Sequence, residues 1–97
     1  MKSIVQTEKE CYLCRKRFGA QKVSHLECHH LFGGGNRNLS EKYGLKVYLC
    51  HYHHNEPPEG AHFNWKTMVE LRRDGQRAFE KHFPNEDFLK IFGRNYL

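Results

Sequence analysis

The sequence has none of the long apolar runs that mark membrane-spanning chains. Nowhere in its 97 residues is there a stretch of about 20 apolar residues, the length that a membrane helix needs. The first ten residues, MKSIVQTEKE, also lack the apolar segment of a secretory signal. We therefore expect a single intracellular, cytoplasmic domain over residues 1–97, without a membrane partner.

Acidic residues are scarce relative to basic ones. The chain has 11 Asp and Glu against 16 Lys and Arg, a formal net charge of +5. This balance suits a polyanionic partner such as DNA, whereas a solvated basic surface is the alternative interpretation. The predicted phosphate contacts are Arg15, Lys16, Arg17, Lys22, Arg37, Arg72, Arg73 and Arg77.

Apolar residues are too few for a large core. Only 38% of the chain is hydrophobic, and a domain of this size buries a limited share of its surface. Small domains of this kind usually need a disulfide or metal staple. The pair Cys11 and Cys14 is closely spaced in a chain without an export signal, which favours metal binding over a disulfide.

A second pair, Cys50 and His53, repeats the same two-residue spacing. We expect it at a strand-to-helix junction, where this spacing points both side chains to one side of the first helical turn. Zinc takes four such ligands in a tetrahedron. The sequence therefore predicts a closed structural Zn²⁺ site made of Cys11, Cys14, Cys50 and His53.

Two alternatives to this ligand set stay open. His54 replaces His53 in one, and Cys28 replaces one of the other thiolates in the second. For Cys28 we favour a third interpretation, a small buried hydrophobe.

The order of predicted elements indicates an α+β fold, a treble clef in which a knuckle, a hairpin and a helix start share one zinc. The first half is expected to contain a knuckle (11–18), a strand (23–31), a glycine-rich loop (33–44), a second strand (45–49) and a short helix (50–55). These give a polar arm (1–10), a zinc-bound ββα core (11–62) and C-terminal helices (63–97).

The C-terminal helices are predicted from apolar periodicity. Gly75 is expected to bend or break the long helix, and Pro84-Asn85 to end it and cap a last short helix. The aromatic residues of this third are interpreted as core. The predicted helix face consists of Trp65, Met68, Val69, Arg72, Gln76, Phe79 and Phe83.

A second set of histidines lies outside the zinc ligands: His29, His30, His54 and His62. Adjacent strand residues point to opposite sides, so one member of the His29-His30 pair can bind a metal while the other faces the space beside it. A metal ion and a neutral imidazole together can hydrolyse a phosphodiester. The alternative is that these histidines lie on the surface or serve the zinc site.

These motifs resemble the HNH (His-Me finger, ββα-metal) endonucleases, and within them the phage recombination-enhancement (RecA-dependent) nucleases. The likeness rests on the stretch from His29 to Gly33, on Leu49-Cys50-x-x-His53-His54, on the later His62 and on Phe79-Glu80. It spans roughly residues 11–83. It implies a phage or prophage origin and a recombinase filament as a partner.

The resemblance also implies roles for single residues. His29 takes the first metal-ligand position, His30 the general-base position and His54 the final ligand position. Such nucleases cleave DNA with one divalent ion, commonly Mg²⁺, and leave a 5′-phosphate. Their middle asparagine, which braces the loop carrying the base, has no match at the usual place; Asn38 is our candidate, and a simple turn residue is the alternative.

His62 is predicted to be a third ligand of the catalytic metal, brought back by a loop that folds over after Pro57-Pro58. Three imidazoles suit Mg²⁺ poorly and favour Mn²⁺ or another transition metal; the alternative is that His62 opens the long helix. The predicted function is a metal-dependent DNA endonuclease. Alternatives are a non-catalytic zinc-finger DNA-binding protein, such as a small phage regulator, and an RNA-directed nuclease.

Overall fold

A two-stranded sheet and a set of helices form the α+β structure of the computed structural model, which describes residues 1–19 and 23–97. The predicted phosphate contact Lys22 lies outside the described residues. No helix in the described part is long and apolar enough to cross a membrane. The elements are α1 (Tyr12–Phe18), β1 (Glu27–His30), the 3-10 helix η1 (Gly34–Asn36), α2 (Arg37–Tyr43), β2 (Lys46–Leu49), α3 (His51–Asn55), α4 (Trp65–His82) and α5 (Phe88–Phe92).

The two predicted strands form one antiparallel hairpin, in which His29 lies opposite Val47 and His30 opposite Lys46. Opposed residues share a face. Val47 and His29 are therefore on the inner face, where both are buried. Cys28 is on the other face and is exposed, so its interpretation as a buried hydrophobe was wrong.

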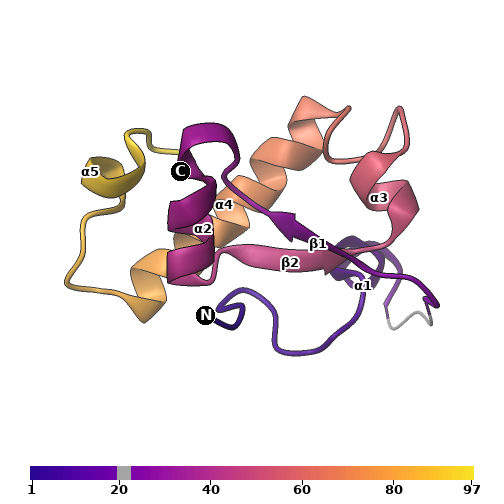
Figure 1. Ribbon diagram of the computed structural model, residues 1–97, viewed down its shortest axis with the longest axis horizontal. Coiled ribbons are helices and arrows are strands. Elements are labelled where there is room, and N and C mark those ends of the chain that lie inside the picture. The colour runs from indigo at the N-terminus through magenta and orange to yellow at the C-terminus, as the bar shows by residue number, and fades with distance from the viewer. Residues whose placement is uncertain (20–22) are drawn as a thin grey trace.

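The first ten residues follow the free edge of β2 as an ordered segment. The Ile4 amide donates to the Gly44 carbonyl at 2.9 Å, and the Ser3 hydroxyl donates to the Lys46 carbonyl at 2.5 Å. The Gln6 side chain accepts from the Tyr48 amide at 2.9 Å. A strand edge exposes unpaired backbone groups, and these bonds satisfy two of them in β2 and one at Gly44 just before the strand. In Figure 1 the indigo segment runs alongside β2.

The loop predicted over 33–44 contains η1 and helix α2 instead. The Ser40 side chain, fully buried, holds α2 against the chain that leaves β1, because its hydroxyl accepts from the Phe32 amide at 3.0 Å and donates to the Phe32 carbonyl at 2.8 Å. Gly44 ends the helix with φ 70°, a left-handed conformation that favours glycine. The glycine run 33–35, which enters η1, indicated a loop, whereas tertiary contacts stabilise a helix directly after it.

Helix α4 is continuous through Gly75, so the predicted break was wrong. The helix passes behind the hairpin, with α2 and α5 at one end of the view and α1 and α3 at the other (Figure 1). A side chain at Gly75 would place its Cβ 2.7 Å from Leu31 Cδ1. Glycine is therefore used here for the close approach of α4 to the chain after β1.

The buried face of α4 differs from the predicted one. Trp65 opens the helix with 67% of its surface exposed, whereas Leu71, absent from the predicted face, is 1% exposed. The predicted aromatic core exists further along: Phe79, Phe88 and Phe92 are buried, and the Phe88 and Phe92 rings stack at 4.5 Å. Asp87, not Asn85, caps α5.

Candidate metal centres

Two pairs of ligand residues stand at the beginnings of two short helices. Cys11 is the N-cap of α1, and its sulfur accepts from the Cys14 amide at 3.4 Å. Cys50 is the N-cap of α3, and His53 follows within that helix. The same two-residue spacing in both helices therefore points each pair into one space.

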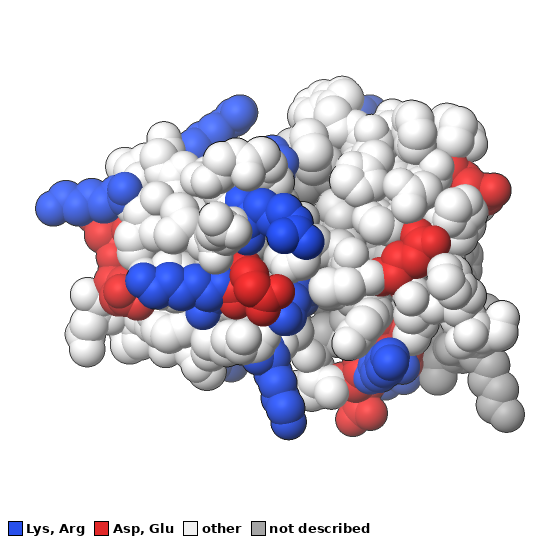
Figure 2. Space-filling view, in the orientation of Figure 1, with Lys and Arg blue, Asp and Glu red and all other residues white. Residues whose placement is uncertain are grey.

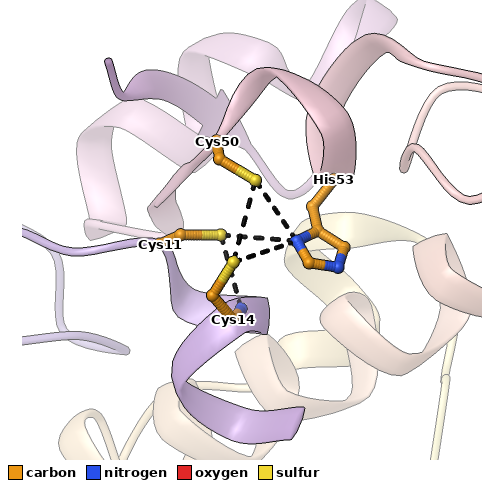
Figure 3. Close-up of side chains that lie close together, drawn as sticks. All are labelled: Cys11, Cys14, Cys50 and His53. Atoms are coloured by element: carbon orange, nitrogen blue, oxygen red, sulfur yellow. Dashed lines mark hydrogen bonds between the residues drawn. The ribbon is translucent and has the colours of Figure 1, made fainter. Parts of the chain in front are cut away.

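The four ligand atoms of Cys11, Cys14, Cys50 and His53 lie within 4.8 Å of one another. Cys14 Sγ is 3.8 Å from Cys50 Sγ, and His53 Nδ1 is 3.6, 3.4 and 3.3 Å from the sulfurs of Cys11, Cys14 and Cys50. A tetrahedral zinc needs separations of about 3.8 Å between sulfurs and about 3.5 Å between sulfur and nitrogen. Figure 3 shows the four side chains converging, and this Cys₃His cluster could hold a metal ion such as zinc.

The three sulfurs of the cluster lie close enough to oppose one another's ionisation. Burial, together with the neighbouring thiols of Cys11 and Cys50, raises the pKa of Cys14 to about 12. Several adjacent thiols cannot ionise together unless a positive charge compensates them. Neither alternative ligand joins the cluster, since His54 turns to a carboxylate and Cys28 is exposed on the outer face of β1.

A second cluster brings together His29, His54 and His62, whose ring nitrogens also lie within 4.8 Å of one another. His54 Nε2 and His62 Nε2 are 3.0 Å apart. The chain beyond α3 folds back as predicted: the Ala61 amide donates to the His53 carbonyl at 2.8 Å and the His62 amide to the His54 carbonyl at 3.3 Å. His62 does not cap α4, because Asn64 does.

His29 has the chemical state that a metal ligand requires. Its Nε2 is buried and has no hydrogen-bond partner among the described residues. Desolvation first, and then the nearby His54, His62, Arg72 and His30, lower the pKa of His29 to about 3. The imidazole is therefore neutral near pH 7 and keeps a lone pair free for a cation.

His30 lies on the opposite face of β1 and contacts a carboxylate that the sequence analysis missed. Its Nε2 is 3.0 Å from Glu41 Oε1, and the other oxygen of Glu41 accepts from Lys46 Nζ at 2.6 Å. Lys46 first, and His30 next, lower the pKa of Glu41 to about 2. The predicted brace, Asn38, is exposed on α2, so Glu41, one turn further along, is the residue that holds His30.

Glu27 is a second carboxylate that the sequence analysis missed. Its Oε1 is 2.8 Å from His54 Nδ1 and accepts from Asn55 Nδ2 at 3.0 Å. Its Oε2 is 3.0 Å from both His25 Nε2 and His51 Nδ1. These partners, His54 first, lower the pKa of Glu27 to about 2. The sequence signal for Glu27 was its place two positions before His29 in a predicted strand, because residues at i and i+2 of a strand lie on one face.

Several predicted phosphate contacts are engaged in ion pairs within the protein. Lys16 Nζ lies 2.7 Å from Asp74 and 2.9 Å from Glu70, and Arg17 lies 2.8 Å from Glu70. Longer contacts join Arg77 to Asp74 at 3.4 Å and Arg15 to Glu10 at 3.8 Å. The pairs of Lys16 and Arg17 tie α1 to α4, and all of these pairs neutralise part of the basic charge.

The other arginines have a different environment. Arg72 Nε donates to the Leu31 carbonyl at 2.9 Å, and its guanidinium lies over the Phe32 and Tyr96 rings. Arg73 Nε donates to the Tyr96 carbonyl, and Arg37 is exposed at the start of α2. On the face in Figure 2, Lys and Arg side chains are most numerous over the half that carries α2 and α5, with acidic side chains among them.

Comparisons with protein-family models, curated proteins and solved structures give no match to this chain.

Proposed function

We propose that this protein is a metal-dependent DNA endonuclease with two metal centres. The observation that carries the proposal is the three-histidine cluster, in which the buried Nε2 of His29 has no partner among the described residues. In this proposal the Cys₃His cluster holds a structural zinc, and the hairpin with α3 forms a treble-clef ββα-metal core. A zinc site alone would account for only one of the two clusters.

The donor set of His29, His54 and His62 fits a divalent transition metal such as Mn²⁺ better than Mg²⁺. When bound, such an ion would polarise a phosphodiester and stabilise the leaving oxygen. His62 is exposed, so substrate and water can reach this side of the cluster. The buried His29 and half-buried His54 hold the opposite side and exclude solvent there.

His30 is proposed as the general base, because it follows His29 at the end of β1 and carries a carboxylate partner. With its Nε2 proton directed to Glu41, the ring keeps the Nδ1 lone pair to accept a proton from water. Glu41 prevents the ring from turning and stabilises the imidazolium that forms. This arrangement replaces the brace that we sought in Asn38.

Arg72 is the predicted phosphate contact with the strongest geometric support. Its Nε bond to the Leu31 carbonyl and its position over two aromatic rings fix the guanidinium. Its positive charge is close enough to His29 to help lower the pKa of that residue. A guanidinium held by Nε can still present its terminal amino groups to a phosphate. The proposed partner is DNA, with a recombinase filament and a phage origin as expectations from the resemblance.

The test is cleavage of supercoiled plasmid in the presence and absence of Mg²⁺ or Mn²⁺. His30→Ala should reduce the cleavage rate by about 10²–10⁴-fold, the contribution typical of a general base. Zinc content and DNA affinity should stay unchanged, because His30 is neither a zinc ligand nor a phosphate anchor. His82→Ala, which removes an exposed histidine of α4, is the matched control; wild-type cleavage by His30→Ala would contradict the mechanism.

A non-catalytic DNA-binding protein is the second candidate. It is favoured by the exposed Arg37 and by the Cys₃His cluster, which can serve as a purely structural site. The same assay separates the two functions. Binding of DNA without cleavage in the presence of any divalent ion would contradict the nuclease and support the DNA-binding protein. Cleavage of RNA but not of DNA would instead show an RNA-directed nuclease.

A further inference from the structure

Glu27 accepts contacts from four side chains, and three of them are histidines. It lies on β1 two residues before His29, so the two side chains share a face of the strand. Both contact His54 of α3 from that face. Glu27 Oε1 contacts His54 Nδ1 at 2.8 Å and Asn55 Nδ2 at 3.0 Å. Both of these partners belong to α3, a helix of five residues. The carboxylate therefore links the strand that carries one proposed ligand to the helix that carries another.

The four contacts make Glu27 unsuitable as a metal ligand itself. An ionised carboxylate has about four lone-pair positions, and one nitrogen each of His54, Asn55, His25 and His51 lies 2.8–3.0 Å from its oxygens. Both oxygens are thus engaged, whereas the cluster of free ring nitrogens consists of histidines alone. Glu27 stands behind His54, on the side of the ring away from His62.

We propose that Glu27 is the positioning residue of the three-histidine metal centre. Its carboxylate accepts a hydrogen bond from the protonated Nδ1 of His54, which leaves the Nε2 lone pair of that ring to bind the ion. The inference rests on the proposed metal centre, and it adds a residue that binds no metal. Outer carboxylate partners of this kind orient a ligating imidazole and increase its basicity.

The local geometry offers His54 a competing arrangement, which makes the proposal specific. Asn55 Nδ2 lies 3.1 Å from His54 Nδ1. An unprotonated Nδ1 would accept from Asn55 and put the proton on Nε2, the atom 3.0 Å from His62 Nε2. The Glu27 carboxylate lies 2.8 Å from His54 Nδ1, and an ionised acceptor makes the stronger hydrogen bond. Glu27 therefore selects the tautomer that can bind a metal.

The first measurement uses the wild-type protein with its structural zinc and no added metal. Long-range ¹H–¹⁵N correlation spectra at pH 8 report which ring nitrogen of His54 carries the proton. We expect a protonated Nδ1. A proton on Nε2 would overturn the proposal without reference to any variant or to cleavage.

The second measurement is the affinity for Mn²⁺, followed by calorimetry and by the electron paramagnetic resonance signal of the free ion. Glu27→Ala should bind Mn²⁺ about 10–100-fold more weakly, and Glu27→Gln, which keeps an acceptor oxygen, should lose less. Glu8→Gln removes an exposed carboxylate and should match wild type. One zinc per chain should remain in every variant.

The outcomes separate this inference from the nuclease proposal. Wild-type Mn²⁺ affinity in both Glu27 variants overturns the positioning role even if DNA is cleaved. Weakened Mn²⁺ binding in a protein that never cleaves DNA supports Glu27 and overturns the nuclease. If Glu27→Ala does not fold, Glu27→Gln and the wild-type tautomer decide the question; absence of Mn²⁺ binding by wild type overturns both proposals.

Discussion

His62 is the side chain whose removal most directly tests the three-histidine centre. It is the exposed member of the cluster, and its Nε2 lies 3.0 Å from that of His54. We expect His62→Ala to weaken Mn²⁺ binding by more than about tenfold, since the loss of even an outer partner costs that much. Cleavage should fall and recover partly at high Mn²⁺ concentration.

The metal titration of His62→Ala is compared with that of wild type and of His82→Ala. If oxygen ligands dominate the site, high Mg²⁺ should restore cleavage by His62→Ala to the wild-type level. If the three imidazoles dominate it, high Mg²⁺ should not. Titration curves of His62→Ala that coincide with wild type for both metals would assign His62 to the loop before α4 and remove it from the centre.

Glycine in the middle of α4 serves packing between elements. Because its Cβ would approach Leu31 Cδ1 to 2.7 Å, and Leu31 is buried, Gly75→Val should lower the free energy of unfolding by about 1–3 kcal/mol, the usual cost of overpacking. The measurement is urea unfolding. Gly35→Ala, where nothing lies within 4 Å of the added Cβ, is the control, and equal stability of Gly75→Val and wild type would disprove the close contact.

The link between the N-terminal ends of α1 and α3 is expected to depend on zinc. Purified protein should carry one tightly held zinc per chain, and Cys14→Ser should lose it. Because metal binding in such small sites supplies folding free energy on the order of 10 kcal/mol, the variant should unfold or aggregate, as circular dichroism and zinc analysis would show.

Cys28→Ser provides the matched control for this prediction. Cys28 is exposed and lies outside the Cys₃His cluster, so its substitution should leave zinc content and unfolding unchanged. A folded Cys14→Ser protein that keeps stoichiometric zinc would refute the assignment of the four ligands.

The molecule as a whole is basic, with a net charge of +5, and DNA binding should therefore weaken steeply with salt. Each phosphate contact contributes about 0.9 to the slope of log affinity against log salt. Arg37→Gln should reduce the slope by about one, whereas Lys16→Gln should change it less, because that amine already pairs with Asp74 and Glu70. Affinity that stays flat between low and high salt would exclude an electrostatic DNA surface.

Local spacing made the candidate ligands predictable. Cys11 and Cys14, like Cys50 and His53, are three residues apart, and the backbone geometry of a helix start places such residues together whatever the rest of the chain does. Apolar periodicity also predicted the second strand and the long helix, whereas residue types predicted the first strand. Gly75 misled the prediction because packing against Leu31, and not helix propensity, determines the residue there.

The sequence by itself determined which residues can ligate a metal and in which pairs they occur, because those pairings depend on bonds and turns within a few residues. The tertiary structure alone decided which histidine joined which cluster, how the chain after Pro57-Pro58 brought His62 back to His54, and that Glu27 and Glu41 contact the histidines. These contacts join separate elements, and a carboxylate in a sequence gives no sign of its partner until the packing of helices against the hairpin brings the two together.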